Sequence, residues 1–158
     1  GDVRADGLEA VWDALLQRAT GGSPSPHSER SYIALQAYLP VSAETTAWLQ
    51  GLRLRLRNRT GLATTFGYGP RFLHSTGQLH KGDAGRGVFV QLTADHDQDA
   101  AIPDEAGSPE SSITFRTLIQ AQALGDAQAL SDAGRRVVRF HLGRQVVGGL
   151  RRLADAVE

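Results

Sequence analysis

The stretch YIALQAYLP, residues 32–40, decides the fold class. Apolar side chains occupy nearly every position from Tyr32 to Leu39, a pattern typical of a strand that is covered on both faces. Pro40 then ends the run. We expect three more buried strands, in LATTFGYG at 62–69, RGVFVQLT at 86–93 and RRVVRFHL at 135–142.

Helical patterns separate these strands. A first helix is expected behind Asp6, a candidate cap, with apolar side chains at Leu8, Val11, Trp12, Leu15 and Leu16. Ser42 and Glu44 open a second helix, residues 113–134 predict a helix broken near Gly125 and Asp126, and residues 144–158 predict a closing helix. Strands that alternate with helices predict βαβ units. We therefore expect an α/β fold, a three-layer αβα sandwich with a mainly parallel sheet.

The composition excludes several classes of site. The 158 residues suit a single domain over 1–158, with flexible loops expected at 21–30 and 94–112. Acidic and basic residues balance at 17 each, so we expect no nucleic-acid partner, and we interpret the arginines of residues 53–59 as a solvated helix face. Without Cys there are no disulfides, thiolate metal sites or cysteine nucleophiles.

The chain shows no apolar run of the roughly 18 to 20 residues that a membrane span needs. We expect no membrane partner and a cytoplasmic location. The chain contains no Met and begins at Gly1, so we also expect it to be a fragment of a longer protein.

The stretch RFLHSTGQLHKG, residues 71–82, is the candidate site. It contains two histidines, a glutamine, two hydroxyls and Lys81, the only lysine of the chain. It follows the second expected strand directly. Ligands of parallel α/β sheets gather at the carboxyl ends of the strands, so the segment lies where a site would be expected.

Several segments together resemble the carboxyl-terminal part of bacterial glucose-6-phosphate isomerases, and most closely the form fused behind a transaldolase in bifunctional proteins. They are YIALQAYLP, RTGLATTFGYGPRFLHSTGQLHKG, GVFVQLT, TFRTLIQAQALGDAQAL and GRRVVRFHLG. The resemblance runs from about Tyr32 to the end of the chain. It departs from the family after Lys81 and Gly82, where Asp83 stands in place of a second glycine, and in the loop from Asp95 to Ser112, which is longer and more acidic.

This resemblance implies one of two flavodoxin-like sugar isomerase halves that together interconvert glucose 6-phosphate and fructose 6-phosphate, with no metal or organic cofactor. In the family a histidine assists ring opening, a glutamate moves a proton between two sugar carbons, and serine and threonine groups of the other half hold the phosphate. The glutamate and most of the phosphate cradle belong upstream of the matched region. The implied partners are a sugar phosphate, the missing amino-terminal half and a transaldolase domain.

The family's H-x-x-x-Q-L pattern places the ring-opening histidine at His74, with His80 as the alternative. Ring opening moves a proton between the ring oxygen and the anomeric hydroxyl, and an imidazole, with an unperturbed pKa of about 6.5, suits that transfer. If residues 72–81 are helical, His74, Gln78 and Lys81 share one face.

The remaining candidates each have a structural alternative. Ser75 and Thr76 either bind an oxyanion at a helix N-terminus or cap the helix. Gln78 either donates to sugar hydroxyls or makes a structural hydrogen bond, and Lys81 either stabilises a phosphate or enediolate charge or is idle. Arg144 stands where the family carries a catalytic lysine; a guanidinium titrates too high for proton exchange, so only substrate contact is expected of it.

A second function stays open, namely a sugar-phosphate-binding or dimerisation module without catalysis. An isolated half must expose the surface that normally meets its partner, and Phe72 and Phe115 are candidates for it, so self-association is expected. The run DHDQD at 95–99 lacks the glycine turn and distal Glu of a calcium loop, so no metal site is expected there. The other histidines, His27, His96 and His141, match no motif.

Overall fold

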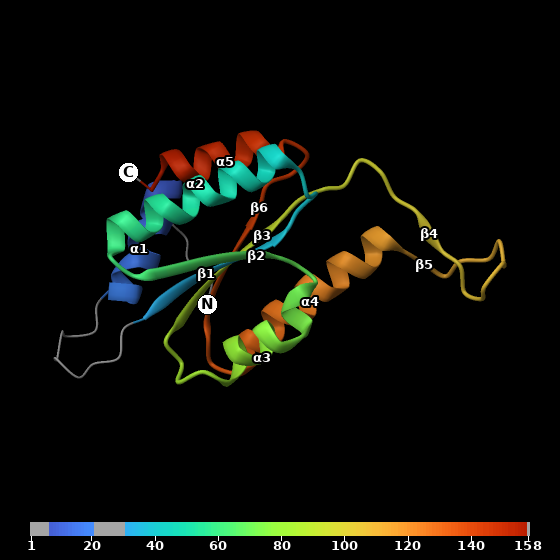
Figure 1. Cartoon of the computed structure of the whole chain (residues 1–158), viewed down its shortest axis with the longest axis horizontal. Coiled ribbons are helices and arrows are strands. Elements are labelled where there is room, and N and C mark those ends of the chain that lie inside the picture. The colour runs from blue at the N-terminus through green and yellow to red at the C-terminus, as the bar shows by residue number, and fades with distance from the viewer. Residues whose placement is uncertain (1–6, 21–30, 158) are drawn as a thin grey trace.

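A computed structural model describes residues 7–20 and 31–157 and contains a four-stranded sheet between two layers of helices (Figure 1). The strand order is β2-β1-β3-β6, and all three pairings are parallel. The strands are β1 Tyr32–Tyr38, β2 Ala63–Tyr68, β3 Gly87–Thr93 and β6 Arg136–His141. The four predicted strands and the α/β fold class are therefore confirmed.

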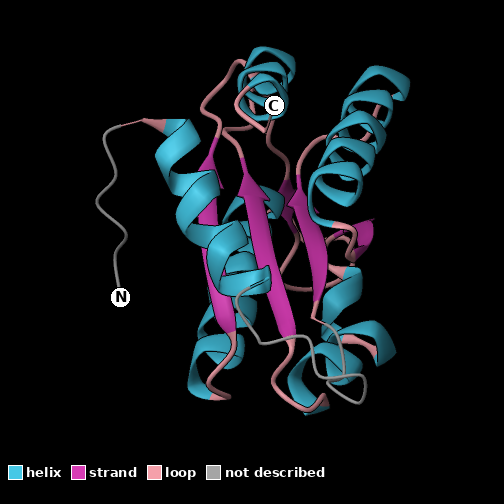
Figure 2. Ribbon diagram, turned by 90° about the vertical axis from the view of Figure 1, so that its left-hand side faces the viewer, coloured by secondary structure: helices cyan, strands magenta, loops and turns pink. Residues whose placement is uncertain are grey.

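Helices cover both faces of this sheet (Figure 2). One face is covered by α1 Leu8–Thr20, α2 Ala43–Thr60 and α5 Val146–Asp155. The other is covered by α3 Ser75–Gly82 and α4 Phe115–Asp132, with the 3-10 turn η1 Arg71–Leu73 in front of α3. The predicted cap Asp6 and the loop 21–30 lie outside the described residues.

The largest core lies on the α1, α2 and α5 face. Leu49, Leu52 and Leu56 of α2 are fully buried against the sheet. Trp12 of α1 is buried too, and its indole Nε1 donates to the carbonyl oxygen of Leu153 in α5 over 3.1 Å. Burial of large apolar side chains stabilises the fold by about 1.5–3 kcal/mol each.

The ends of α2 explain its sequence. The Ser42 side chain accepts the backbone N–H of Thr45 at 3.0 Å, which confirms the predicted N-cap, and Gly61 ends the helix at a φ of 67°. Arg55 and Arg59 donate to the carbonyl oxygens of Ala154 and Val157, both at 2.8 Å. Part of the arginine run therefore supports the end of α5 in addition to facing solvent.

Two expectations for the second half of the chain are corrected. The helix α4 is continuous from Phe115 to Asp132, because Gly125 stays helical and Asp126 is buried at its inner face. The acidic segment 94–112, predicted to be a flexible loop, contains β4 Ala101–Ile102, which pairs antiparallel with β5 Ile113–Thr114. This pair extends away from the body of the molecule (Figure 1).

The strand order contains a reversal. From β1 the chain passes through α2 to β2 on one side of the sheet. From β3, on the other side of β1, it passes through α4 to β6 and so away from β1. Neighbouring parallel strands whose connections leave in opposite directions open a crevice at their carboxyl ends. Here Tyr38 of β1 and Thr93 of β3 are partners in register at that point.

Candidate functional site

The path from β2 to α3 is fixed by close packing. The Gly69 N–H continues the sheet by donating to the Ala37 carbonyl oxygen over 2.9 Å. A Cβ at Gly69 would lie 2.4 Å from the Tyr38 ring, and a Cβ at Gly77 would lie 1.4 Å from the Phe72 carbonyl oxygen. Only glycine fits at either place, and these contacts position the polar segment at the carboxyl end of β2.

His74 occupies the N-cap position of α3. Its backbone is extended, with φ −105° and ψ −152°, and its carbonyl oxygen accepts the N–H of Gln78 over 3.0 Å. The imidazole is exposed and makes no capping hydrogen bond. The helix therefore begins at Ser75, and the shared face predicted for His74, Gln78 and Lys81 is corrected, since it assumed helical geometry from residue 72.

Ser75, Thr76 and Gln78 are exposed beside His74. Their side chains make no hydrogen bond or ion pair to any residue in the described part of the chain. The residue at the cap is His74, so the hydroxyls of Ser75 and Thr76 are free for another partner. The first N–H groups of a helix also lack intrahelical acceptors, which favours an anion in front of them.

His80 lies on the inner side of α3 and is only 5% exposed. Its ring packs near the rings of Tyr32, Phe72 and Phe89, with centroids 6.3, 6.0 and 5.0 Å away. Burial lowers the pKa of His80, which favours the neutral imidazole, and Gln36 Nε2 lies 3.3 Å from its Nδ1. The geometry is that of a core histidine that accepts a hydrogen bond from Gln36.

Lys81 also points into the fold. Its ammonium lies 2.8 Å from Oδ1 of Asp126, a residue of α4 that is 1% exposed. A buried carboxylate is costly unless a cation neutralises it. The only lysine of the chain therefore joins α3 to α4 and is committed to that ion pair.

Asp83, where the sequence departs from the family, closes the turn into β3. Its carboxylate accepts the Tyr32 hydroxyl at 2.7 Å and the backbone N–H groups of Gly85 and Gly87 at 2.8 and 3.1 Å. Arg135 Nε lies 3.3 Å from Oδ1. Burial alone would raise the pKa of Asp83, but these hydrogen bonds and the Arg135 charge outweigh it and lower the pKa.

Arg144 lies in the turn after β6, at the same edge of the sheet as His74 but on the opposite outer strand. Its side chain is 78% exposed, and its Nε is 3.9 Å from Oδ1 of Asp97. The structure thus gathers His74, Ser75, Thr76 and Gln78 on the surface. His80 and Lys81 lie on the inner side of α3, and Arg144 lies apart from them.

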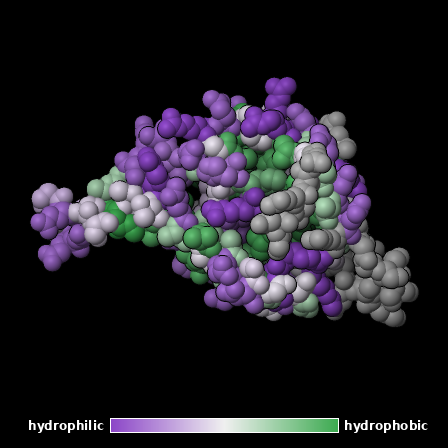
Figure 3. Space-filling view, turned by 180° about the vertical axis from the view of Figure 1, so that it is seen from behind, coloured by the Kyte–Doolittle hydropathy of each residue, from purple (hydrophilic) through white to green (hydrophobic). Residues whose placement is uncertain are grey.

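A groove of about 530 Å³ runs between α3 and the outer strand β2. Thr76, Leu79 and Arg71 line its α3 side, and Thr65 and Gly67 line its β2 side. Leu79 is largely exposed there. Phe115 and Leu124 of α4 are also exposed, but they lie outside this groove. Figure 3 shows further hydrophobic surface where the β4–β5 arm joins the body. Phe115 is exposed as expected, whereas Phe72 is buried against Tyr38 and is corrected to a core residue.

Sequence reasoning missed one group of polar side chains. Thr93 Oγ1 lies 3.1 Å from Nδ1 of His141, and His141 Nε2 lies 3.3 Å from Oδ1 of Asp95. Thr93 and His141 are 48 positions apart in the sequence, so no local motif marks the group. Within residues 7–20 and 31–157, no three His, Asp or Glu side chains gather as metal ligands would. No described helix is long and apolar enough to cross a membrane.

Comparisons with known proteins show the fold and nothing finer. No family model matches the chain. No curated protein matches it either. The chain is similar to the crystal structure of hypothetical protein TT0462 from Thermus thermophilus, with a TM-score of 0.67 and 16% identity. The match covers 93% of this chain and 37% of the other, so the chain spans well under half the length of that protein.

Proposed function

We propose that this chain is the histidine-bearing half of a glucose-6-phosphate isomerase, within a longer cytoplasmic protein that also supplies the proton-shuttling glutamate and the phosphate cradle. The observation that carries the proposal is the exposed His74 imidazole, which stands free at the carboxyl end of β2 beside Ser75, Thr76 and Gln78. A transaldolase domain in the same chain is part of the proposal, on the sequence resemblance.

His74 is the ring-opening residue in this proposal. It reaches a ligand outside the body of the molecule, whereas His80 is enclosed by three aromatic rings. The imidazole would move a proton from the anomeric hydroxyl to the ring oxygen. In glucose 6-phosphate this breaks the C1–O5 bond and leaves the open-chain aldehyde, and in fructose 6-phosphate it breaks the C2–O5 bond and leaves the open-chain ketone. No external proton acceptor is needed, since the same imidazole can return to its starting state.

The neighbours of His74 have binding roles. The amide of Gln78 donates to sugar hydroxyls, and the hydroxyls of Ser75 and Thr76 with the first N–H groups of α3 face the oxygens of the open chain. Arg144 is proposed as a contact to substrate charge, since most of its side chain is exposed. Lys81 is proposed to act on stability alone, through Asp126.

The alternative, a binding or dimerisation module without catalysis, is favoured by the groove beside β2 and by exposed Leu79. The missing half of an isomerase would cover the same surface. Both versions therefore predict self-association of the isolated chain, and only activity separates them.

The test is a coupled assay of fructose 6-phosphate isomerisation by the full-length protein that carries this chain. The His74→Ala variant should lose at least about 100-fold in kcat with an unchanged thermal midpoint, because the imidazole is exposed and makes no capping hydrogen bond to α3. Leu73→Ala, a neighbouring exposed position, is the matched control and should keep kcat within about twofold.

Inhibition by 6-phosphogluconate separates ring opening from binding. Its chain is open, so the inhibition constant should be the same for wild type and His74→Ala. Weaker inhibition in the variant would instead make His74 a binding residue. An unchanged kcat would remove His74 from the mechanism, and turnover by the 158-residue chain alone would place the base inside it.

A further inference from the structure

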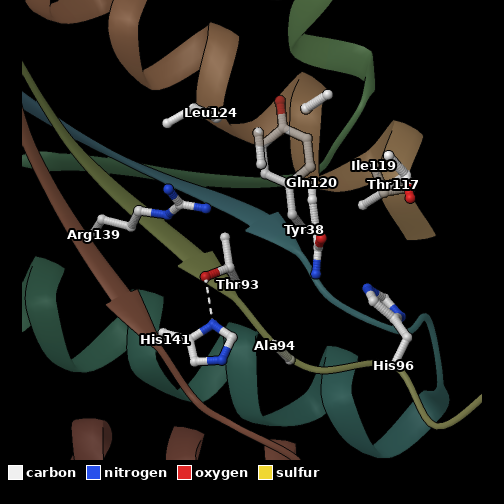
Figure 4. A pocket seen from close by; sticks show the side chains of 12 residues that line it. Tyr38, Thr93, Ala94, His96, Thr117, Ile119, Gln120, Leu124, Arg139 and His141 are labelled. Atoms are coloured by element: carbon white, nitrogen blue, oxygen red, sulfur yellow. Dashed lines mark hydrogen bonds between the residues drawn. The ribbon is translucent and has the colours of Figure 1, made fainter.

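A second pocket, independent of the proposed isomerase site, lies at the crevice between β1 and β3 (Figure 4). Its volume is about 400 Å³, within the range of small-molecule sites. Tyr38 and Thr93, the register partners at the ends of these strands, form its floor, and residues 117–124 of α4 form one wall. None of the seven residues predicted for the isomerase site lines it.

Apart from the Tyr38 phenol, the charged and titratable side chains that line this pocket are all basic. Arg139 of β6 turns its guanidinium toward Tyr38 and Thr93, while His141 and His96 face the same space from either side (Figure 4). Arg139 and His96 make no hydrogen bond or ion pair with any residue that the structure describes. The lining contains no Asp or Glu. A guanidinium and two imidazoles that line one pocket, with no carboxylate in its lining, favour an anion.

The contact of Thr93 with His141 supplies a donor that can adapt to an anion. Asp95 lies 3.3 Å from His141 Nε2 and orients the ring, so that Nδ1 faces the Thr93 hydroxyl at 3.1 Å. When the ring is neutral with its proton on Nε2, Nδ1 accepts from Thr93. When Nδ1 carries the proton, its N–H donates to Thr93 Oγ1, and the hydroxyl proton is free to point at a ligand.

The α4 wall contributes apolar side chains to the pocket. The side chains of Ile119 and Leu124 and the ring of Tyr38 line the cavity together with Arg139 (Figure 4). A ligand made only of charge would leave this surface uncovered. An anion attached to a compact apolar or weakly polar body would cover it and gain from burial.

We propose that this pocket binds a small organic anion, with its phosphate or carboxylate group held by Arg139, His141 and Thr93 and its body against Ile119 and Leu124. All the residues that hold the ligand in this proposal lie in the described part of the chain. It uses the crevice at the strand-order reversal, which is where open parallel sheets bind their ligands.

The test is a titration of the 158-residue chain, followed by the ring resonances of its five histidines. Phenyl phosphate should shift the resonances of His96 and His141 along a saturable curve and leave that of His74 in place. Inorganic phosphate should bind more weakly because it cannot cover the apolar wall. Benzoate distinguishes the two acid groups, since tighter binding than phenyl phosphate would identify a carboxylate site.

Substitutions decide whether the pocket is responsible. Arg139→Gln should weaken phenyl phosphate at least tenfold, whereas Arg151→Gln, the same charge change on an exposed residue of α5, should alter it less than twofold. Leu124→Ser, also at an exposed position, should weaken phenyl phosphate and leave inorganic phosphate unchanged. Unsaturable shifts, equal losses in both arginine variants, or movement of His74 alone would each overturn the proposal.

Discussion

The two faces of the central sheet bury different kinds of side chain. Toward α1, α2 and α5, the strands β1 and β3 present only apolar groups, namely Ile33, Leu35, Ala37, Val88, Val90 and Leu92. Toward α3 and α4 the same strands present Gln36 and Tyr38, then Gln91 and Thr93, all buried. The first face needs only complementary shape. The second also depends on hydrogen-bond partners for its polar side chains, and both proposed sites lie beside it.

The polar face is held by contacts between distant elements. Gln36 Nε2 reaches His80 at 3.3 Å, Gln91 Nε2 donates to the Ala123 carbonyl oxygen at 2.8 Å, and Lys81 pairs with Asp126. Burial raises the pKa of Tyr38, and the nearby charge of Asp126 raises it further. Displaced pKa values within the core therefore gather on the α3 and α4 face. That difference predicts that shape governs stability on one side and charge on the other.

The largest expected effect is on the apolar face. Leu52→Ala should lower the free energy of unfolding by about 4 kcal/mol, because Leu52 is fully buried and the surrounding side chains cannot close the cavity. Leu54→Ala is the control on the same helix: that side chain is 41% exposed and should cost about 1 kcal/mol or less. Urea unfolding measures both. Equal losses would contradict the placement of the core.

A smaller effect, of electrostatic origin, is expected on the polar face. Lys81→Met should cost about 3 kcal/mol, since it keeps the length of the side chain but leaves the Asp126 carboxylate buried without its cation. Adding Asp126→Leu should recover most of that loss, because the remaining charge is removed. Urea unfolding of the two single variants and the double variant gives the coupling. Independent, additive losses would show that the pair contributes nothing.

The fold follows from sequence where one face of an element decides its form. Continuous apolar runs predict the buried strands. Ser42 predicts the start of α2 because an N-cap depends only on neighbouring residues. The break predicted near Gly125 failed for a nonlocal reason. Asp126 is polar and follows a glycine, yet it is buried in an unbroken helix since Lys81, far earlier in the chain, neutralises it.

The site was only partly accessible from sequence. The composition of residues 71–82 predicted a polar segment, and that segment is largely exposed at the carboxyl end of the strands. Which of its side chains face solvent and which face the core depends on where α3 begins. Because His74 is extended and α3 begins at Ser75, His80 and Lys81 lie on the inner side of the helix. The pocket around Arg139 lacked any signal, because Thr93, His141 and Asp95 meet only through strand pairing.

The smallest expected effect concerns pH, and it sharpens the contrast between the faces. Asp83 has a pKa lowered in the folded chain, so its carboxylate stabilises the fold above the ordinary pKa of about 3.9, and this contribution is lost as pH falls through the folded value. Asp83→Asn should cost about 2 kcal/mol at pH 7, because the amide cannot accept from Tyr32, Gly85 and Gly87 as a carboxylate does.

Urea unfolding of wild type and Asp83→Asn between pH 3 and pH 8 measures this effect. The difference in the free energy of unfolding between wild type and Asp83→Asn should narrow toward pH 3, since a protonated Asp83 resembles Asn. Asp97→Asn, at a side chain that is 74% exposed, should leave the curve of the wild type nearly unchanged at every pH. A gap that stays constant with pH would mean that Asp83 acts through its shape and not its charge, and the polar face would then obey the same rule as the apolar one.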